Sequence, residues 1–115
     1  MAEDGRTLKR RHLIYYLEVF NENNDELLGH VVDITTKGIK LIGKHPIKSK
    51  QEFSLHMKLP EEYSASGLLK FDAVSLWSNK DVNPDFMVTG FQTLNLDKEA
   101  AKTIKKLINL LGFND

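Results

Sequence analysis

Two arginines near the start of the chain have a chemistry that suits phosphate. Arg6 and Arg10 lie four residues apart in the segment Arg6-Thr7-Leu8-Lys9-Arg10. A planar guanidinium donates two parallel charge-assisted hydrogen bonds to a phosphate, and it can pair with the O6/N7 edge of guanine in a similar way. Taken alone, such a segment is more often a solvated basic tail.

A second segment, Asp33-Ile34-Thr35-Thr36-Lys37-Gly38, combines a carboxylate, a hydroxyl and a glycine. The Asp33 carboxylate can accept hydrogen bonds from the donor edge of guanine. The Thr35 hydroxyl falls on the same side of an extended chain, because side chains alternate along a strand. Gly38 permits a positive φ or the close approach of a ligand. Taken alone, this pattern is typical of a tight turn in which Asp and Thr bond their own main chain.

The sequence offers little that would support catalysis or metal binding. None of the four histidines, His12, His30, His45 and His56, has another at metal-ligand spacing. His30 and His56 lie within predicted strands, where we expect outward, solvated imidazoles. There is no glycine-rich phosphate loop and no serine in the context of a nucleophile elbow. We therefore expect no enzymatic activity, no metal and no cofactor.

Composition restricts the class of protein. The chain has 115 residues, no cysteine and a formal net charge of zero. This length fits one domain, and the lack of cysteine excludes disulfides and thiolate metal sites. The zero net charge argues against a general nucleic-acid binder. No apolar run approaches the ~20 residues that span a bilayer, so we expect a cytoplasmic protein that does not insert into membranes.

Hydrophobic patterning predicts a β-rich domain with one terminal helix. Residues 1–12 are polar and predict a flexible basic arm. Strands are predicted by β-branched, aromatic and alternating residues over 13–20, 26–35, 39–42, 53–59, 68–77 and 86–93. Ile104, Leu107, Ile108 and Leu111 recur at helical spacing, which predicts a helix over about 97–111 with Asp97 as N-cap. The strand spacing favours an antiparallel barrel or sandwich.

The order and spacing of the two polar segments resemble the PilZ domain family. That family has an Arg-x-x-x-Arg segment before its first strand and an Asp/Asn-x-Ser-x-x-Gly segment further on. Arg6 and Arg10 match the first, and Asp33, Thr35 and Gly38 match the second, with threonine where serine is usual. Residues 13–20 and 27–30 look like the family's first hairpin, and 89–91 like its last strand. The resemblance covers nearly the whole chain.

The resemblance implies a six-stranded antiparallel β-barrel with a C-terminal α-helix, here over residues 13–115. It also implies binding of cyclic di-GMP, a bacterial second messenger. By position, Arg6 and Arg10 would bind phosphate and the guanine O6/N7 edge, and Asp33 would accept from the guanine N1/N2 edge. Thr35 would add a hydroxyl bond, and Gly38 would allow close approach.

Some alternatives remain open at this point. Arg11 could replace Arg10 as the second arginine, although only Arg6 and Arg10 place arginine at both ends of the motif. The expected function is a stand-alone receptor or adaptor that changes shape on binding cyclic di-GMP and signals to an unidentified protein partner. The main alternative is an interaction module on the same fold that binds no nucleotide. An RNA-binding barrel is less favoured, because the net charge is zero.

Overall fold

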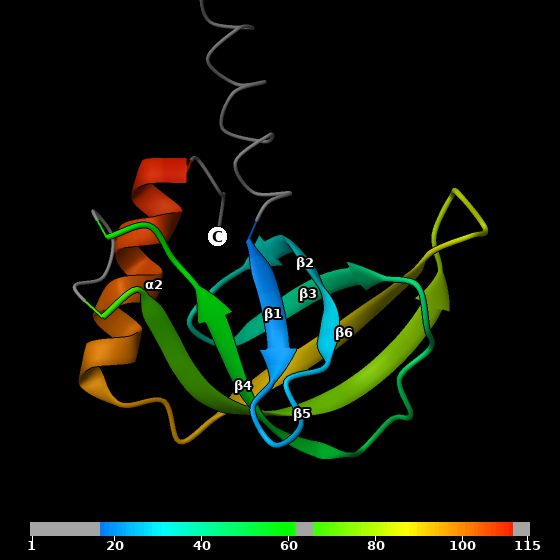
Figure 1. Ribbon diagram of the computed structural model, residues 1–115, viewed down its shortest axis with the longest axis horizontal. Coiled ribbons are helices and arrows are strands. Elements are labelled where there is room, and N and C mark those ends of the chain that lie inside the picture. Colours follow the sequence, from blue (N-terminus) through cyan, green and yellow to red (C-terminus); the bar gives the residue numbers. More distant parts are fainter. Residues whose placement is uncertain (1–16, 62–65, 112–115) are drawn as a thin grey trace, which may run out of the picture.

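The computed structural model describes residues 17–61 and 66–111, which form six strands and one helix (Figure 1). The elements are β1 (Glu18–Asn21), β2 (Leu27–Ile34), β3 (Gly38–Gly43), β4 (Glu52–Lys58), β5 (Leu68–Lys80), β6 (Met87–Leu94) and α2 (Lys98–Leu111). The predicted arm over residues 1–12, with Arg6, Arg10 and Arg11, lies outside the described residues.

The strands close into an antiparallel barrel in the order β1-β2-β3-β6-β5-β4. Most strands pair with their neighbours in sequence, but β6 inserts between β3 and β5, and β1 pairs with β4 to complete the ring. The prediction of a six-stranded antiparallel barrel with a C-terminal helix is confirmed.

Alternation along the strands fills the inside of the barrel with apolar side chains. In β5, Leu69, Phe71 and Ala73 are buried while Lys70 and Asp72 between them are exposed. This follows from the two-residue period of a strand, which sends successive side chains to opposite faces. Polar residues therefore gather on the outer faces, where any site for a polar ligand must lie.

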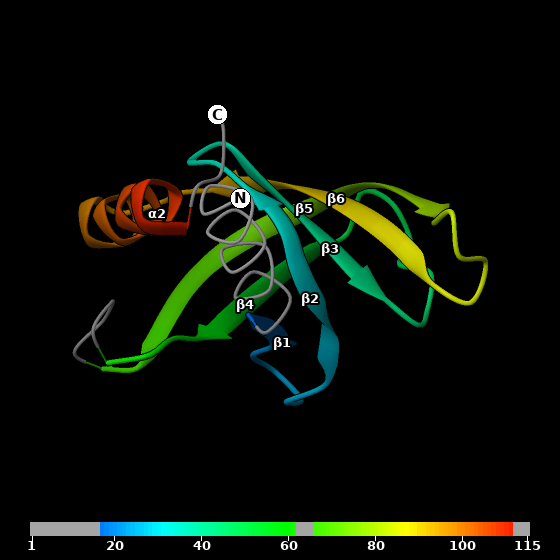
Figure 2. The same ribbon diagram turned by 90° about the horizontal axis from the view of Figure 1, so that it is seen from above.

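The helix α2 covers one end of this barrel. Its first turn is capped as predicted, because Asp97 Oδ1 accepts a hydrogen bond from the Ala100 amide at 2.8 Å. Ile104 and Leu107 are fully buried in the same apolar cluster as the strand side chains. Figures 1 and 2 both show α2 at one end of the molecule and the turn between β5 and β6 at the other.

Two strands differ from the prediction by more than one residue at an end, whereas the bounds of the other four agree within one residue. The first strand was expected over residues 13–20, of which 13–16 lie outside the described part; the observed β1 starts at Glu18 and continues to Asn21. The fifth strand was expected to end at Trp77 but runs on to Lys80, because Ser78 and Lys80 still pair with Thr89 and Met87 of β6. Its polar residues have the composition of a turn, yet tertiary pairing keeps them extended.

Candidate functional site

The Asp33–Gly38 segment is a compact turn between β2 and β3. The Thr35 amide donates to the Gly38 carbonyl at 2.8 Å. The Thr35 hydroxyl oxygen accepts from the Lys37 and Gly38 amides at 3.1 and 3.2 Å. Asp33 Oδ1 accepts from the Ile34 amide at 3.0 Å. Asp33, Thr35 and Gly38 thus lie in one turn, and their polar groups hold the turn itself.

Gly38 is needed for packing against the neighbouring strand. A Cβ at this position would lie 2.7 Å from the Phe91 carbonyl oxygen of β6, which is too close for any real side chain. Gly38 does not have a positive φ, so the close approach expected from the sequence is an approach of protein backbone. Thr93 strengthens the same contact, because its hydroxyl donates to the Thr36 carbonyl at 2.8 Å.

The turn forms one wall of an open hollow of about 520 Å³ on the outside of the barrel. We call it the first hollow; it is lined by Asp33, Thr35, Thr36, Lys37, Gly38, Ile39, Lys40, Leu76, Trp77, Gly90, Phe91, Gln92 and Thr93. Its volume falls within the range of small-molecule sites. The residues come from β2, β3, β5 and β6, so only the closed barrel brings them together.

A row of neighbouring residues crosses the floor of the first hollow. Strand pairing places Asp33 opposite Lys40, Lys40 opposite Gly90, and Gly90 opposite Trp77. Irregularities in register lie beside both ends of the row, between Val31 and Asp33 in β2 and between Ser75 and Trp77 in β5. Bulges of this kind re-aim side chains next to functional sites.

Gly90 makes room for the indole ring of Trp77. A Cβ on Gly90 would lie 2.5 Å from Trp77 Cε2 and 2.7 Å from Cζ2, so the ring rests directly on the β6 backbone. Trp77 remains 36% exposed, and Lys40 Nζ lies 6.0 Å from the ring centroid. The row therefore offers an aromatic surface, an ammonium and a carboxylate side by side.

The sequence did not identify Trp77, Lys40 or Gly90 as site residues. Their juxtaposition depends on strand register, which local patterns leave open. The one usable signal was a lone tryptophan at the end of a predicted strand, because a flat aromatic ring is a surface on which a base can stack.

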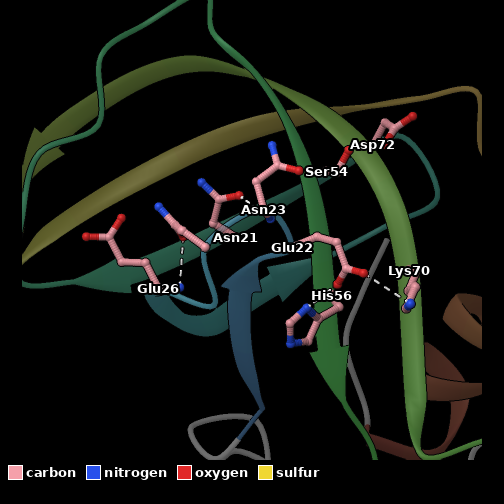
Figure 3. A network of polar contacts seen from close by, with 9 residues as sticks. Asn21, Glu22, Asn23, Glu26, Ser54, His56, Lys70 and Asp72 are labelled. Carbon is pink, nitrogen blue, oxygen red and sulfur yellow. Dashed lines mark hydrogen bonds and ion pairs between the residues drawn. The ribbon is translucent and has the colours of Figure 1, made fainter.

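A second polar cluster lies on the β1–β4–β5 side of the barrel (Figure 3). Glu22 Oε1 is 2.6 Å from His56 Nδ1, and Glu22 Oε2 is 3.1 Å from Lys70 Nζ. Hydrogen bonds from Lys70 and then from His56 lower the pKa of Glu22 below its ordinary value. The His56 ring also stacks on Phe20, with ring centroids 5.2 Å apart.

The prediction of a solvated imidazole is wrong for His56. This residue is only 8% exposed, because Phe20 and Glu22 cover it. His30 does remain partly exposed, and its Nε2 is 3.8 Å from Glu18 Oε2. Within residues 17–61 and 66–111, no three His, Asp or Glu side chains form a group that could hold a metal ion. No helix in the same ranges is long and apolar enough to cross a membrane.

Known proteins support the assignment of the fold. The model of a family described as "PilZ domain" matches residues 6–110 of the chain. Among solved structures, the PilZ domain of YcgR from Escherichia coli with c-di-GMP matches with a TM-score of 0.64 at 13% identity, covering 86% of this chain and 84% of that one. A search of curated proteins gave no match.

Two longer proteins share the fold. MotI/DgrA, the inhibitor of motility from Bacillus subtilis, matches with a TM-score of 0.67 at 16% identity, and this chain covers 46% of its length. MrkH from K. pneumonia in its apo state matches with a TM-score of 0.62 at 18% identity, again over 46% of its length. The chain thus spans about half of each of these proteins.

Proposed function

The chain belongs to the PilZ domain family, and from this premise we propose that it is a receptor for cyclic di-GMP that signals to a protein partner. The observation that carries the proposal is the first hollow, which is lined both by the residues that match the family's Asp-x-Ser-x-x-Gly segment and by the partly exposed Trp77. One of the similar solved structures, the PilZ domain of YcgR, contains c-di-GMP.

Each side of the first hollow suits one part of the ligand. Asp33 has no ion pair in the described part of the chain, so its carboxylate can accept from the guanine N1/N2 edge. Trp77 offers a flat surface on which a base can stack. Lys40, also without an ion pair there, can bind a phosphate.

Thr35 can replace the usual serine without losing a hydrogen bond. Its oxygen accepts from two backbone amides, but its own hydrogen has only a long contact of 3.5 Å to the Gly38 carbonyl. That hydrogen can therefore turn toward a ligand acceptor. Gly38 would serve the site by letting the turn pack against β6, since a Cβ there would meet the Phe91 carbonyl oxygen.

The arginines would complete the site from the N-terminal arm. We assign phosphate and the guanine O6/N7 edge to Arg6 and Arg10, with Arg11 as the alternative to Arg10. Charge-assisted hydrogen bonds contribute about 1.5–3 kcal/mol each, and base stacking about 1–3 kcal/mol. Ordering part of the arm costs about 1–2 kcal/mol per residue and offsets much of this gain. We therefore expect an affinity no tighter than about micromolar, which corresponds to about 8 kcal/mol.

The output of such a receptor is a change of shape or surface. The arm over residues 1–12 would fold across the barrel when the ligand binds, which presents a new surface to a partner. PilZ domains are receptor and adaptor domains, which agrees with a non-enzymatic role. Cyclic di-GMP is a bacterial cytoplasmic messenger, so we place the protein in that compartment.

Calorimetric titration of the full chain with cyclic di-GMP tests this function. We expect micromolar binding, and a loss of at least about tenfold for Asp33→Ala and for Arg10→Ala, because each removes a charge-assisted bond. Glu22→Gln is the matched control on the other face and should bind as the parent does. The proposal is wrong if the parent chain gives no heat with cyclic di-GMP and its melting temperature does not change.

One observation favours a second function. The Asp33–Gly38 turn satisfies most of its polar groups internally, as an ordinary structural turn would. An interaction module on the PilZ fold that binds no nucleotide would have the same turn. The titration above separates the two functions, because the module predicts no binding.

A further inference from the structure

A second hollow lies at the end of the barrel away from α2. It has a volume of about 740 Å³ and lies between the start of β2, the end of β3 and the turn between β5 and β6. Its apolar lining includes Leu27, Leu28, Ile47 and Phe86. Among the described residues, none of the candidate nucleotide-binding residues Asp33, Thr35 and Gly38 lines it, so it is separate from the first hollow.

The segment beside this hollow is strongly basic. Residues 44–51 contain three lysines and one histidine but no acidic residue. Lys44, Lys48 and Lys50 lie in the loop between β3 and β4, and all three are exposed. In the described part of the chain none of them forms an ion pair. This loop, over residues 44–51, is called the basic loop below.

The basic loop is held firmly against β5. The fully buried Ser75 hydroxyl donates to the Lys48 carbonyl at 2.6 Å and accepts from the Gln51 amide at 3.0 Å. The Lys50 amide donates to the Ser75 carbonyl at 2.7 Å, although Lys50 has a strained φ of 62°. The lysines thus extend from a fixed backbone, which lowers the entropy lost when a partner binds.

Exposed apolar side chains stand close to the hollow. Leu27, in its lining, is 44% exposed, and Val82 is wholly exposed in the β5–β6 turn between the lining residues Asp81 and Asn83. Residues 44–47 of the basic loop line the hollow, and Lys48 and Lys50 follow them in the same loop. The loop and the hollow together are complementary to a segment that carries both acidic and apolar side chains.

We propose that the second hollow and the basic loop dock an extended acidic segment of a partner protein, which inserts one or two apolar side chains. The lining of the second hollow holds two carboxylates, Glu26 and Asp81, and one lysine, Lys44, so the acidic side chains of the segment contact the basic loop while its apolar side chains enter the hollow. A polyanion without apolar side chains would gain nothing from the apolar lining, which argues for a peptide over a nucleic acid. The proposal is independent of nucleotide binding, since the two hollows have no lining residue in common.

Fluorescence anisotropy with the full chain tests the docking site. The probe is a short fluorescein-labelled peptide of glutamates with two interspersed leucines. We expect saturable binding that weakens with salt and drops at least about tenfold when the leucines become serines or the glutamates become glutamines. Lys44→Glu/Lys48→Glu/Lys50→Glu should lower the affinity by a similar factor. Lys98→Glu/Lys102→Glu/Lys105→Glu on exposed positions of α2 is the charge-matched control and should bind as the parent does.

Three outcomes overturn the proposal. The first is no binding at up to about 1 mM peptide by a parent chain whose amide spectrum is that of a folded protein. The second is equal loss from both triple variants, which indicates only general charge attraction. The third is that the chain binds single-stranded DNA or phosphatidylglycerol vesicles more tightly than the peptide, and that the triple substitution at Lys44, Lys48 and Lys50 weakens this binding. Cyclic di-GMP titration of the same variants separates failure here from failure of nucleotide binding.

Discussion

Two outer faces of the barrel carry similar charged side chains, which form ion pairs on one face and not on the other. On the β1–β4–β5 face, Glu22 pairs with His56 and Lys70, and the imidazole stacks on Phe20. On the β2–β3–β6–β5 face, Asp33 and Lys40 have no ion pair in the described ranges, although strand pairing places them opposite each other.

The difference separates charges that serve the fold from charges available to a ligand. The carboxylate and ammonium of the first face already have partners, so a ligand would have to displace them. On the second face neither charge has an ion-pair partner among the described residues, so a ligand can approach them without breaking an ion pair. An exposed ion pair contributes little to stability, so leaving Asp33 and Lys40 unpaired costs the fold about 1 kcal/mol at most.

The sharpest test of this comparison removes one aromatic side chain from each face and compares the effects on binding and stability. Trp77→Ala should weaken cyclic di-GMP binding by about tenfold to a hundredfold, because a stacked base contributes about 1–3 kcal/mol. Phe20→Ala is the counterpart on the other face; it should leave the affinity unchanged and lower the urea midpoint. Calorimetry and urea unfolding measure both. A weaker affinity for Phe20→Ala, with normal binding by Trp77→Ala, would reverse the roles of the two faces.

A smaller effect is expected from Gly90→Ala, which adds a methyl group beneath Trp77. The new Cβ would lie 2.5 Å from Cε2, so the partly exposed ring must move away from the strand. We expect the emission of this single tryptophan to shift to the red and the affinity to fall by about tenfold or less. Unchanged emission and affinity would show that the ring position does not matter for binding. Gly43→Ala, whose Cβ would crowd the Leu28 carbonyl oxygen outside the first hollow, controls for the cost of a crowded Cβ in a strand.

The smallest effect concerns pH and the paired face. The lowered pKa keeps Glu22 charged in the folded chain at pH values where the unfolded chain is protonated. Its contribution to stability is present above the ordinary value of 4.5 and is lost as pH falls through the lower folded value.

Urea unfolding at about pH 7 and about pH 3 tests this sign. Glu22→Gln should lower the midpoint at the higher pH, and the difference from the parent should shrink at the lower pH. Lys70→Gln removes the same ion pair and should behave alike. An equal difference at both pH values would mean that the ion pair does not contribute.

Most helices and strands could be predicted from the sequence, because the patterns that mark them involve residues close together in the chain. Alternation marked the strands, and Asp97 followed by helical spacing marked the start of α2. The extension of β5 to Lys80 was missed, because Ser78, Asn79 and Lys80 have turn composition while their strand state comes from pairing with β6.

The candidate site was readable only in part. Asp33, Thr35 and Gly38 fall within one short segment, so a motif could reveal them. Trp77 and Gly90 meet only after the barrel closes, and His56 is covered by a partner 34 residues away in sequence. Local patterns contain no information about such register-dependent contacts.

The strand β3 connects the two hollows described above. It starts at Gly38 in the first hollow and ends at Gly43 in the second, and hydrogen bonds to β2 and β6 hold it on both sides. If one ligand shifts this strand, thermodynamic linkage requires the effect to be mutual: a partner that tightens messenger binding is itself bound more tightly, by the same factor, when messenger is present. The abundance of the partner would then set the messenger concentration at which the receptor responds, so sensitivity would belong to the pair of proteins and not to this chain alone.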